Sequence, residues 1–216
     1  VAKKEYEQLS SILSRFSRTY FVEDLLTEVL NDYGIKDKLI RQICQNECIT
    51  EITDDLLELA PAKLARHLIQ GVPIKRKSLT NYLSTNNYSL RPLHNFFFTR
   101  DSAVSVFNRI LISSMANRVR EREALIMHTI FDHHPEFTST TISNKGYPVS
   151  AEKVSIEGGD ILIARDDIVL MGIGTRTTSQ GVDFLLNRLK ENKHKQHVVI
   201  QELPHKPESF IHLDMA

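Results

Sequence analysis

The spacing of apolar residues changes near residue 89, and this change constrains the fold more than any other feature. Before it, apolar residues recur three and four positions apart, the period of an amphipathic helix. After Ser89-Leu90-Arg91-Pro92, short apolar runs alternate with helical stretches and tight Gly or Asp turns. We therefore predict a helix over 1–19 at the edge of an α/β domain, a helical bundle over 20–88, and α/β structure over 89–216.

Start and stop residues bound the helices expected in the first half. We expect Gly34 to end the second helix, a third to run from Asp37 to about Asn46, and Thr53 to act as the N-cap of a fourth. Pro61 suits the first position of a fifth, which closes at Gly71. The first two helices carry apolar stripes made of Leu9, Ile12, Leu13, Phe16, Val22, Leu25, Leu26, Val29 and Leu30.

The second half contains two successive units of strands followed by one helix, at about 104–134 and 154–192. Two such units are compatible with a divergent, propeller-like repeat. Helices are expected over 118–133 and 178–192. Strands are expected over 104–107, 110–112, 154–156, 161–164, 168–172, 197–201 and 209–213.

Composition excludes several classes of protein. The 27 basic and 27 acidic residues cancel, so no overall field favours nucleic acid or a membrane surface. No apolar run is long enough to cross a bilayer, and no N-terminal segment resembles a signal peptide. Cys44 and Cys48 do not make a disulfide framework, so we expect a reducing cytoplasm.

The two ends of the chain are unusual. It begins at Val1, its first methionine is Met115, and no capping or turn residues follow the apolar run that ends at Leu213. We therefore expect a polypeptide that is truncated at both ends.

Four polar clusters interrupt the apolar pattern of the second half. On a strand, His212 and Asp214 would point to the same face, because successive side chains alternate. Two glycines separate Glu157 from Asp160 and allow the backbone to turn sharply and to approach a ligand closely. Asp101 follows an apolar Phe96-Phe97-Phe98 run, which places it at the end of a buried strand. Arg176 follows another apolar strand, with Thr177-Thr178 capping a helix.

Each cluster also has a purely structural interpretation. Glu157 and Asp160 fit a hairpin turn with two solvated acids, and Arg100-Asp101 fits a surface ion pair. Cys44 and Cys48 share a helix face, where packing is favoured over metal binding, which needs further ligands. The histidines at 133 and 134 suit the negative end of a helix dipole.

Taken together, the clusters resemble arginine deiminases, members of the guanidino-group-modifying (pentein) superfamily. The resemblance implies a five-bladed α/β propeller, here only partly present, with an inserted α-helical bundle. Five segments carry it in order and at similar spacing: Pro92-Leu93-His94-Asn95-Phe96-Phe97-Phe98-Thr99-Arg100-Asp101, Met115 through Glu123, Ile156-Glu157-Gly158-Gly159-Asp160, Gly172-Ile173-Gly174-Thr175-Arg176-Thr177 and His212-Leu213-Asp214.

The resemblance also implies roles for individual residues. Glu157 and His212 would move protons, while Asp101 and Asp214 would hold the guanidinium and Asp160 would orient it. The substrate carboxylate would meet Asn95, Arg120 and Arg176. The family's nucleophilic cysteine lies beyond its His-x-Asp motif, and neither cysteine of this chain matches it. The family needs no metal or organic cofactor.

Three functions remain open. The first is hydrolysis of L-arginine to L-citrulline and ammonia, with the nucleophile absent from this chain and the chain alone inactive. The second is amidino transfer to an amine within the same superfamily. The third is a non-catalytic guanidinium-binding protein. For the first we expect L-arginine as partner, no nucleic acid or membrane, and a possible homo-oligomer through exposed sheet edges.

Overall fold

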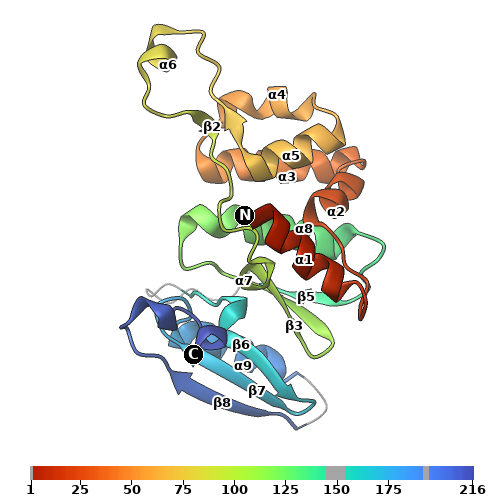
Figure 1. Ribbon diagram of the computed structural model, residues 1–216, viewed down its shortest axis with the longest axis vertical. Helices are drawn as coiled ribbons and strands as arrows, with labels where there is room; N and C mark the ends of the chain where they lie inside the picture. Colours follow the sequence, from red (N-terminus) through yellow and green to blue (C-terminus); the bar gives the residue numbers. More distant parts are fainter. Residues whose placement is uncertain (1, 145–153, 192–194) are drawn as a thin grey trace.

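The computed structural model describes residues 2–144, 154–191 and 195–216, and it has a mixed α/β fold. Short helices occupy one end of the elongated molecule, and two small sheets with their helices occupy the other (Figure 1). The change of apolar spacing near residue 89 thus corresponds to a real change of architecture.

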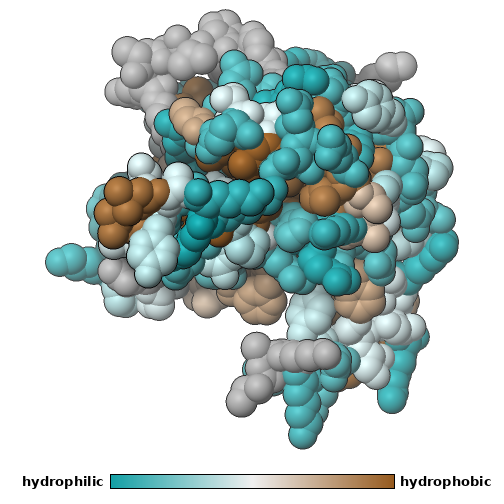
Figure 2. Space-filling model, turned by 90° about the horizontal axis from the view of Figure 1, so that it is seen from above, coloured by the Kyte–Doolittle hydropathy of each residue, from teal (hydrophilic) through white to brown (hydrophobic). Residues whose placement is uncertain are grey.

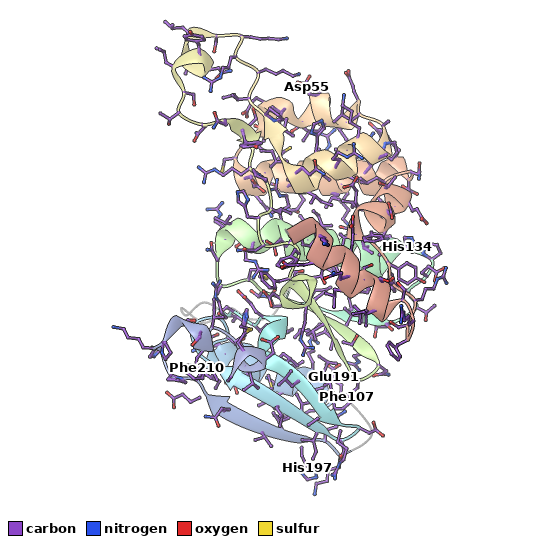
Figure 3. All side chains as sticks on the ribbon, in the orientation of Figure 1. Asp55, Phe107, His134, Glu191, His197 and Phe210 are labelled. Carbon is purple, nitrogen blue, oxygen red and sulfur yellow. The ribbon has the colours of Figure 1, made fainter. Side chains whose placement is uncertain are left out.

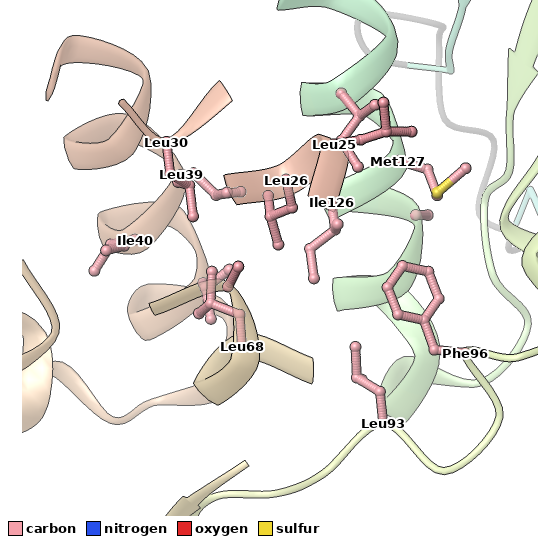
Figure 4. Close-up of a cluster of buried hydrophobic side chains, with 14 of the residues drawn as sticks. Leu25, Leu26, Leu30, Leu39, Ile40, Leu68, Leu93, Phe96, Ile126 and Met127 are labelled. Carbon is pink, nitrogen blue, oxygen red and sulfur yellow. The ribbon is translucent and has the colours of Figure 1, made fainter. Parts of the chain in front are cut away.

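At the helical end, the apolar stripe from Val22 to Leu30 packs into the core as expected, whereas the stripe formed by Leu9, Ile12, Leu13 and Phe16 is exposed. The helical end contains α1 (Ala2–Leu13), α2 (Val22–Val29), α3 (Tyr33–Glu47), η1 (Thr50–Ile52), α4 (Thr53–Leu57), α5 (Pro61–Gln70) and α6 (Leu79–Leu83). The short strands β1 (Val72–Pro73) and β2 (Tyr88–Leu90) pair antiparallel. Leu26, Ile40 and Leu68 are fully buried at its centre (Figure 4). Viewed from this end, the surface is mainly hydrophilic with separate apolar patches (Figure 2).

Three local predictions in this part are wrong. Gly34 does not end a helix, because α3 already begins at Tyr33 with the Asp32 side chain accepting from the amide of Ile35 at 3.0 Å. Thr53 opens α4 but caps nothing with its side chain, which donates to the Thr50 carbonyl instead. Cys48 is exposed, because α3 ends there in a left-handed conformation, so it does not share the buried face of Cys44.

The other end contains two units of the same topology. In the first, β3 (Ala103–Val106) and β4 (Arg109–Ile112) form a hairpin, and α8 (Glu121–His133) leads to β5 (Thr140–Ile142), which pairs parallel with β4. In the second, β6 (Ile161–Arg165), β7 (Ile168–Ile173), α9 (Ser179–Leu189) and β8 (His197–Glu202) repeat this order. The short turn η2 (Arg118–Arg120) precedes α8. The two expected strand–helix units are therefore confirmed.

The two ends of the molecule share one hydrophobic core. Helix α8 packs its buried Ile126 and Ile130 against α2 and α3, in the same cluster as Leu26 and Leu68 (Figure 4). His134, labelled in Figure 3, follows α8 and meets the Glu28 carboxylate at 3.1 Å. The start of the α/β unit is thus packed directly on the bundle. No helix in the described residues is long and apolar enough to cross a membrane.

Three strand predictions are wrong. Residues 209–213 form no strand: η4 (Glu208–Phe210) and η5 (Leu213–Met215) are single 3₁₀ turns, held by short-range bonds such as Met215 N–H to His212 O at 3.2 Å. The Phe96–Phe98 run is a turn with Phe97 and Phe98 exposed, and Asp101 lies in the short helix α7 (Thr99–Ser102). Ile156 makes only an isolated bridge, to Ser114.

The sheet end also has its own hydrophobic cluster around β6, β7 and α9, and substitutions of one buried and one exposed phenylalanine test it. Phe184 of α9 is fully buried in the cluster around β6 and β7, so Phe184→Ala should lower the free energy of unfolding by about 3–5 kcal/mol. Phe16→Ala is the control, because Phe16 is 85% exposed, and it should change stability by less than about 0.5 kcal/mol. Urea unfolding followed by circular dichroism measures both. Equal effects would contradict this assignment of the core.

Candidate active site

Three separate turns meet at one point, and two glycines make this possible. The turns are α7, η3 (Gly158–Asp160) and the segment around η5. A Cβ on Gly158 would lie 1.9 Å from the carbonyl oxygen of Arg100, and one on Gly159 would lie 2.7 Å from Cγ of His212. Side chains at these positions are therefore excluded, and the close approach seen here is to neighbouring turns of the chain itself.

Glu157 and His212 form a buried pair at the centre. His212 Nε2 lies 2.9 Å from Glu157 Oε2, and the residues are 5% and 0% exposed. Glu157 Oε1 accepts from the Ala116 amide at 2.9 Å, and the Glu157 amide donates to Thr177 Oγ1 at 3.1 Å. These bonds hold the carboxylate rigidly against the imidazole.

The environment favours the charged forms of both groups. Burial would raise the pKa of Glu157, but the hydrogen bonds from His212 and Ala116 and the charge of Arg176 outweigh it and lower that pKa. Burial would lower the pKa of His212, but Glu157, together with the nearby Asp101 and Asp160 carboxylates, raises it. The pair therefore favours an imidazolium beside a carboxylate.

Asp101 stands beside His212 and is fixed by an arginine. Its Oδ1 lies 3.7 Å from His212 Nδ1, and its Oδ2 accepts from Arg120 Nη1 at 2.7 Å. Arg120 also donates to Glu123 Oε2 from Nε at 3.0 Å and from Nη2 at 2.7 Å, and to the Asn95 carbonyl at 3.3 Å. Arg120 and Glu123 are buried, and burial raises the pKa of Glu123 against the opposing effect of Arg120. Arg120 thus connects two carboxylates inside the protein.

Asp160 fixes the last segment of the chain. Its Oδ1 accepts from the Leu213 amide at 2.9 Å, and it is fully buried. Burial raises its pKa, against the effects of the Thr177 side chain and the Leu213 amide. Its observed contacts orient the backbone that carries His212.

The remaining predicted residues lie at the edge of the cluster. Asp214 is exposed, with Oδ2 3.7 Å from Arg100 Nε. Arg176 Nη1 lies 3.9 Å from Glu157 Oε1, and Arg176 lines an open cavity of about 730 Å³ that Phe210 also lines (Figure 3). The Asn95 side chain is exposed, and only its carbonyl contacts the cluster.

The structure also identifies neighbours that the sequence patterns did not single out. Glu123 lies in the first turn of α8, three residues after the N-cap Arg120, a spacing that brings side chains together and was available in the sequence. Arg100 donates to the carbonyls of Gly158 and Ile161, so it connects α7 to η3 and is not a surface partner of Asp101. The Thr177 hydroxyl accepts a hydrogen bond from the Glu157 amide. Thr178 is the N-cap of α9, as expected.

Metal binding can be assessed from the same contacts. Asp101, Glu157 and His212 each offer a ligand atom within 4.8 Å of the others, the only such group among the described residues. Arg120 already occupies Asp101 Oδ2, and its Nη1 lies 3.9 Å from Glu157 Oε2. An internal guanidinium therefore supplies positive charge at the place where a cation would bind.

The site thus combines a buried histidine–carboxylate pair with adjoining acids on a mixed α/β fold, groups whose chemistry permits proton transfer and the binding of a cation. Comparisons with known proteins give the family: the arginine deiminase family model matches residues 1–216, and the chain belongs to this family. It is 34% identical to an arginine deiminase of Borrelia garinii subsp. bavariensis, covering 99% of this chain and 55% of the relative. It is 31% identical to one of Listeria monocytogenes serovar 1/2a, covering 90% and 50%. The chain thus spans about half the length of these relatives.

Among solved structures, similarity is weaker. An amidinotransferase of the saxitoxin pathway from Microseira wollei aligns with a TM-score of 0.39 and 17% identity, over 48% of this chain and 34% of that one. A dimethylarginine dimethylaminohydrolase aligns with a TM-score of 0.38 and 19% identity, over 53% and 43%.

The glycine contact can be tested with a matched pair. Gly158→Ala should lower the free energy of unfolding by about 3 kcal/mol or more, because the backbone of α7 must move. Gly174→Ala should change it by less than about 1 kcal/mol, because its Cβ would meet nothing closer than 3.4 Å. Chemical unfolding of both variants checks this, and a stable Gly158→Ala protein would contradict the close approach.

The Glu157–His212 pair predicts a defined pH dependence of stability. Because the pKa of His212 is raised above 6.5, its contribution is present below that value and is lost as pH rises through the raised pKa. Because the pKa of Glu157 is lowered below 4.5, its contribution is present above that value and is lost as pH falls through the lowered pKa.

The difference in the free energy of unfolding between wild type and Glu157→Gln should therefore be largest between pH 4.5 and pH 6.5, at about 1–3 kcal/mol. It should decrease at pH values below and above this range. Urea unfolding across this range measures it. Asp183→Asn, at an exposed position of α9, is the control. A difference that does not vary with pH would contradict the charged pair.

Proposed function

We propose that this chain provides the guanidinium-binding and proton-transfer groups of an arginine deiminase, which hydrolyses L-arginine to L-citrulline and ammonia. The buried Glu157–His212 pair beside Asp101 is the observation that carries the proposal. Family membership supports it, and the relatives' names supply the substrate. Because the chain spans only part of those relatives, the activity is proposed for the whole protein.

Guanidinium binding follows from the two carboxylates beside His212. A guanidinium is planar and permanently charged, and it presents a fork of N–H donors that carboxylates bind in pairs. Asp101 offers Oδ1 because Arg120 holds only its Oδ2. Asp214, exposed on the turn η5, would bind the second edge after releasing its long contact with Arg100.

Proton transfer would be the task of His212 and Glu157. A thiolate adds to the guanidinium carbon, and the imidazolium of His212 gives its proton to the nitrogen that leaves as ammonia. The carbon–nitrogen bond breaks, and a thiouronium remains. The neutral imidazole then takes one proton from water as the oxygen adds to this carbon. The carbon–sulfur bond breaks to restore the thiolate, and the second proton of the added oxygen passes to solvent, where it protonates the released ammonia, so that the neutral ureido product remains. Glu157 stabilises the imidazolium in both steps.

The thiolate would come from outside these 216 residues. Both cysteines of the chain belong to the helical end, in α3 and directly after it, and neither lies in the cluster around His212. The 216-residue chain alone is therefore expected to be inactive. The reaction requires no metal or organic cofactor.

The arginines would divide two tasks. Arg176 lines the open cavity beside Glu157, where it can bind the substrate carboxylate, and Asn95 would assist from its exposed position. Arg120 was expected to bind the same carboxylate. Its four hydrogen bonds to groups of the chain instead support a role in which Arg120 holds Asp101 in position. Asp160 would act through the Leu213 amide.

The fold supports a wider proposal. Two units of identical strand order would be two blades of a five-bladed propeller, with the helical bundle as an insertion over 20–88. We further propose a cytoplasmic enzyme of arginine degradation, and a homo-oligomer formed through its sheet edges.

His212→Asn in the full-length protein should lower kcat for citrulline formation by at least about 100-fold, because the general acid is lost. Glu136→Gln, at an exposed position after α8, should retain activity. Citrulline and ammonia are measured with L-arginine alone and with added glycine. Amidinated glycine and ornithine would favour a transferase, and arginine binding without products would favour a binding protein; either result contradicts the deiminase.

A further inference from the structure

A second cavity lies between the helical end and the start of α8, away from the cluster around His212. It has a volume of about 500 Å³ and is lined by the end of α3, the segment around β2, and η2 with the first turn of α8. Figure 1 shows these elements side by side at the junction of the two ends of the molecule. Sequence patterns assigned no role to its charged residues.

Arg122 is the feature of this cavity that needs explaining. It is only 5% exposed, yet no group in the described part of the chain accepts a hydrogen bond from its Nε or Nη1. Its Nη2 donates to the Arg91 carbonyl, and its Nε lies 3.2 Å from a Glu47 oxygen without hydrogen-bond geometry. A buried guanidinium nitrogen without an acceptor is unfavourable, so an acceptor supplied by a ligand would stabilise the site.

The charged and apolar residues that line the cavity indicate which kind of ligand would fit it. Arg91, Arg118 and Arg122 face Glu47 and Glu121, which leaves one excess positive charge. The other walls are largely apolar and include Ile43, Ile49, Tyr88, Val119 and Leu125. An arginine fork matches a carboxylate, whereas a doubly charged phosphate would meet two glutamates and apolar walls.

We propose that this cavity binds a small organic anion with one carboxylate and an apolar body, and that the carboxylate is held by Arg122. The site is independent of the proposed deiminase activity. Its position joins the bundle to the helix that carries Arg120 and Glu123, so the ligand would contact both ends of the molecule.

Isothermal titration calorimetry with benzoate tests the proposal. Benzoate should bind saturably, and Arg122→Gln should weaken it by about tenfold or more, because a charge-assisted hydrogen bond is lost. Arg118→Gln should weaken it by about threefold; this residue is exposed, so the variant can be measured even if Arg122→Gln does not fold. Because Arg118 also lines the cavity beside Arg176, the Arg176→Gln control below shows which of the two cavities binds benzoate.

Two controls separate this cavity from other cationic surfaces. Arg66→Gln removes an exposed arginine of α5, and Arg176→Gln alters the cluster around Glu157; both should retain benzoate affinity. Absence of saturable binding, equal affinity in wild type and the folded Arg122→Gln and Arg118→Gln variants, or binding of inorganic phosphate without benzoate would each overturn the proposal.

Discussion

The contact of Gly158 and Gly159 with the neighbouring turns is the constraint on which the site depends. It brings α7, η3 and the segment around His212 together, although they lie far apart in the sequence. Once the backbones are this close, their side chains share one small volume. Asp101, Glu157, Asp160 and His212 are therefore buried together, and each must find a charged or hydrogen-bonded partner there.

Those partners arise from charges that alternate through the cluster. Buried carboxylates at 101, 123 and 157 surround the guanidinium of Arg120, and His212 sits between Glu157 and Asp101. Removing one member would leave another buried charge without compensation, which destabilises strongly. The same arrangement keeps Asp101 and His212 in fixed positions, a requirement of any site that binds a cation and moves a proton.

Local patterns in the sequence were sufficient for much of the fold. Pro61 and Gly71 bound α5, Thr178 caps α9, and both strand–helix units form where apolar spacing predicts them. The strand at 209–213 failed because alternation of side chains needs a partner strand, and Leu213 bonds to the Asp160 side chain instead. The three-residue spacing of Arg120 and Glu123 could have indicated their contact. The hydrogen bond from Arg120 to Asp101 joins residues nineteen positions apart, and such a contact cannot be derived from local spacing.

The repeated topology explains why the functional groups gather at one place. Each unit carries an aspartate just before its first strand, Asp101 before β3 and Asp160 before β6. Each also carries an arginine just before its helix, Arg120 before α8 and Arg176 before α9. Equivalent loops of adjacent units thus present an acid and a cation, and the Ser114–Ile156 bridge joins the units between them. A site assembled in this way gains its opposing charges from repetition of one loop pattern, and His212 adds the group that can transfer a proton.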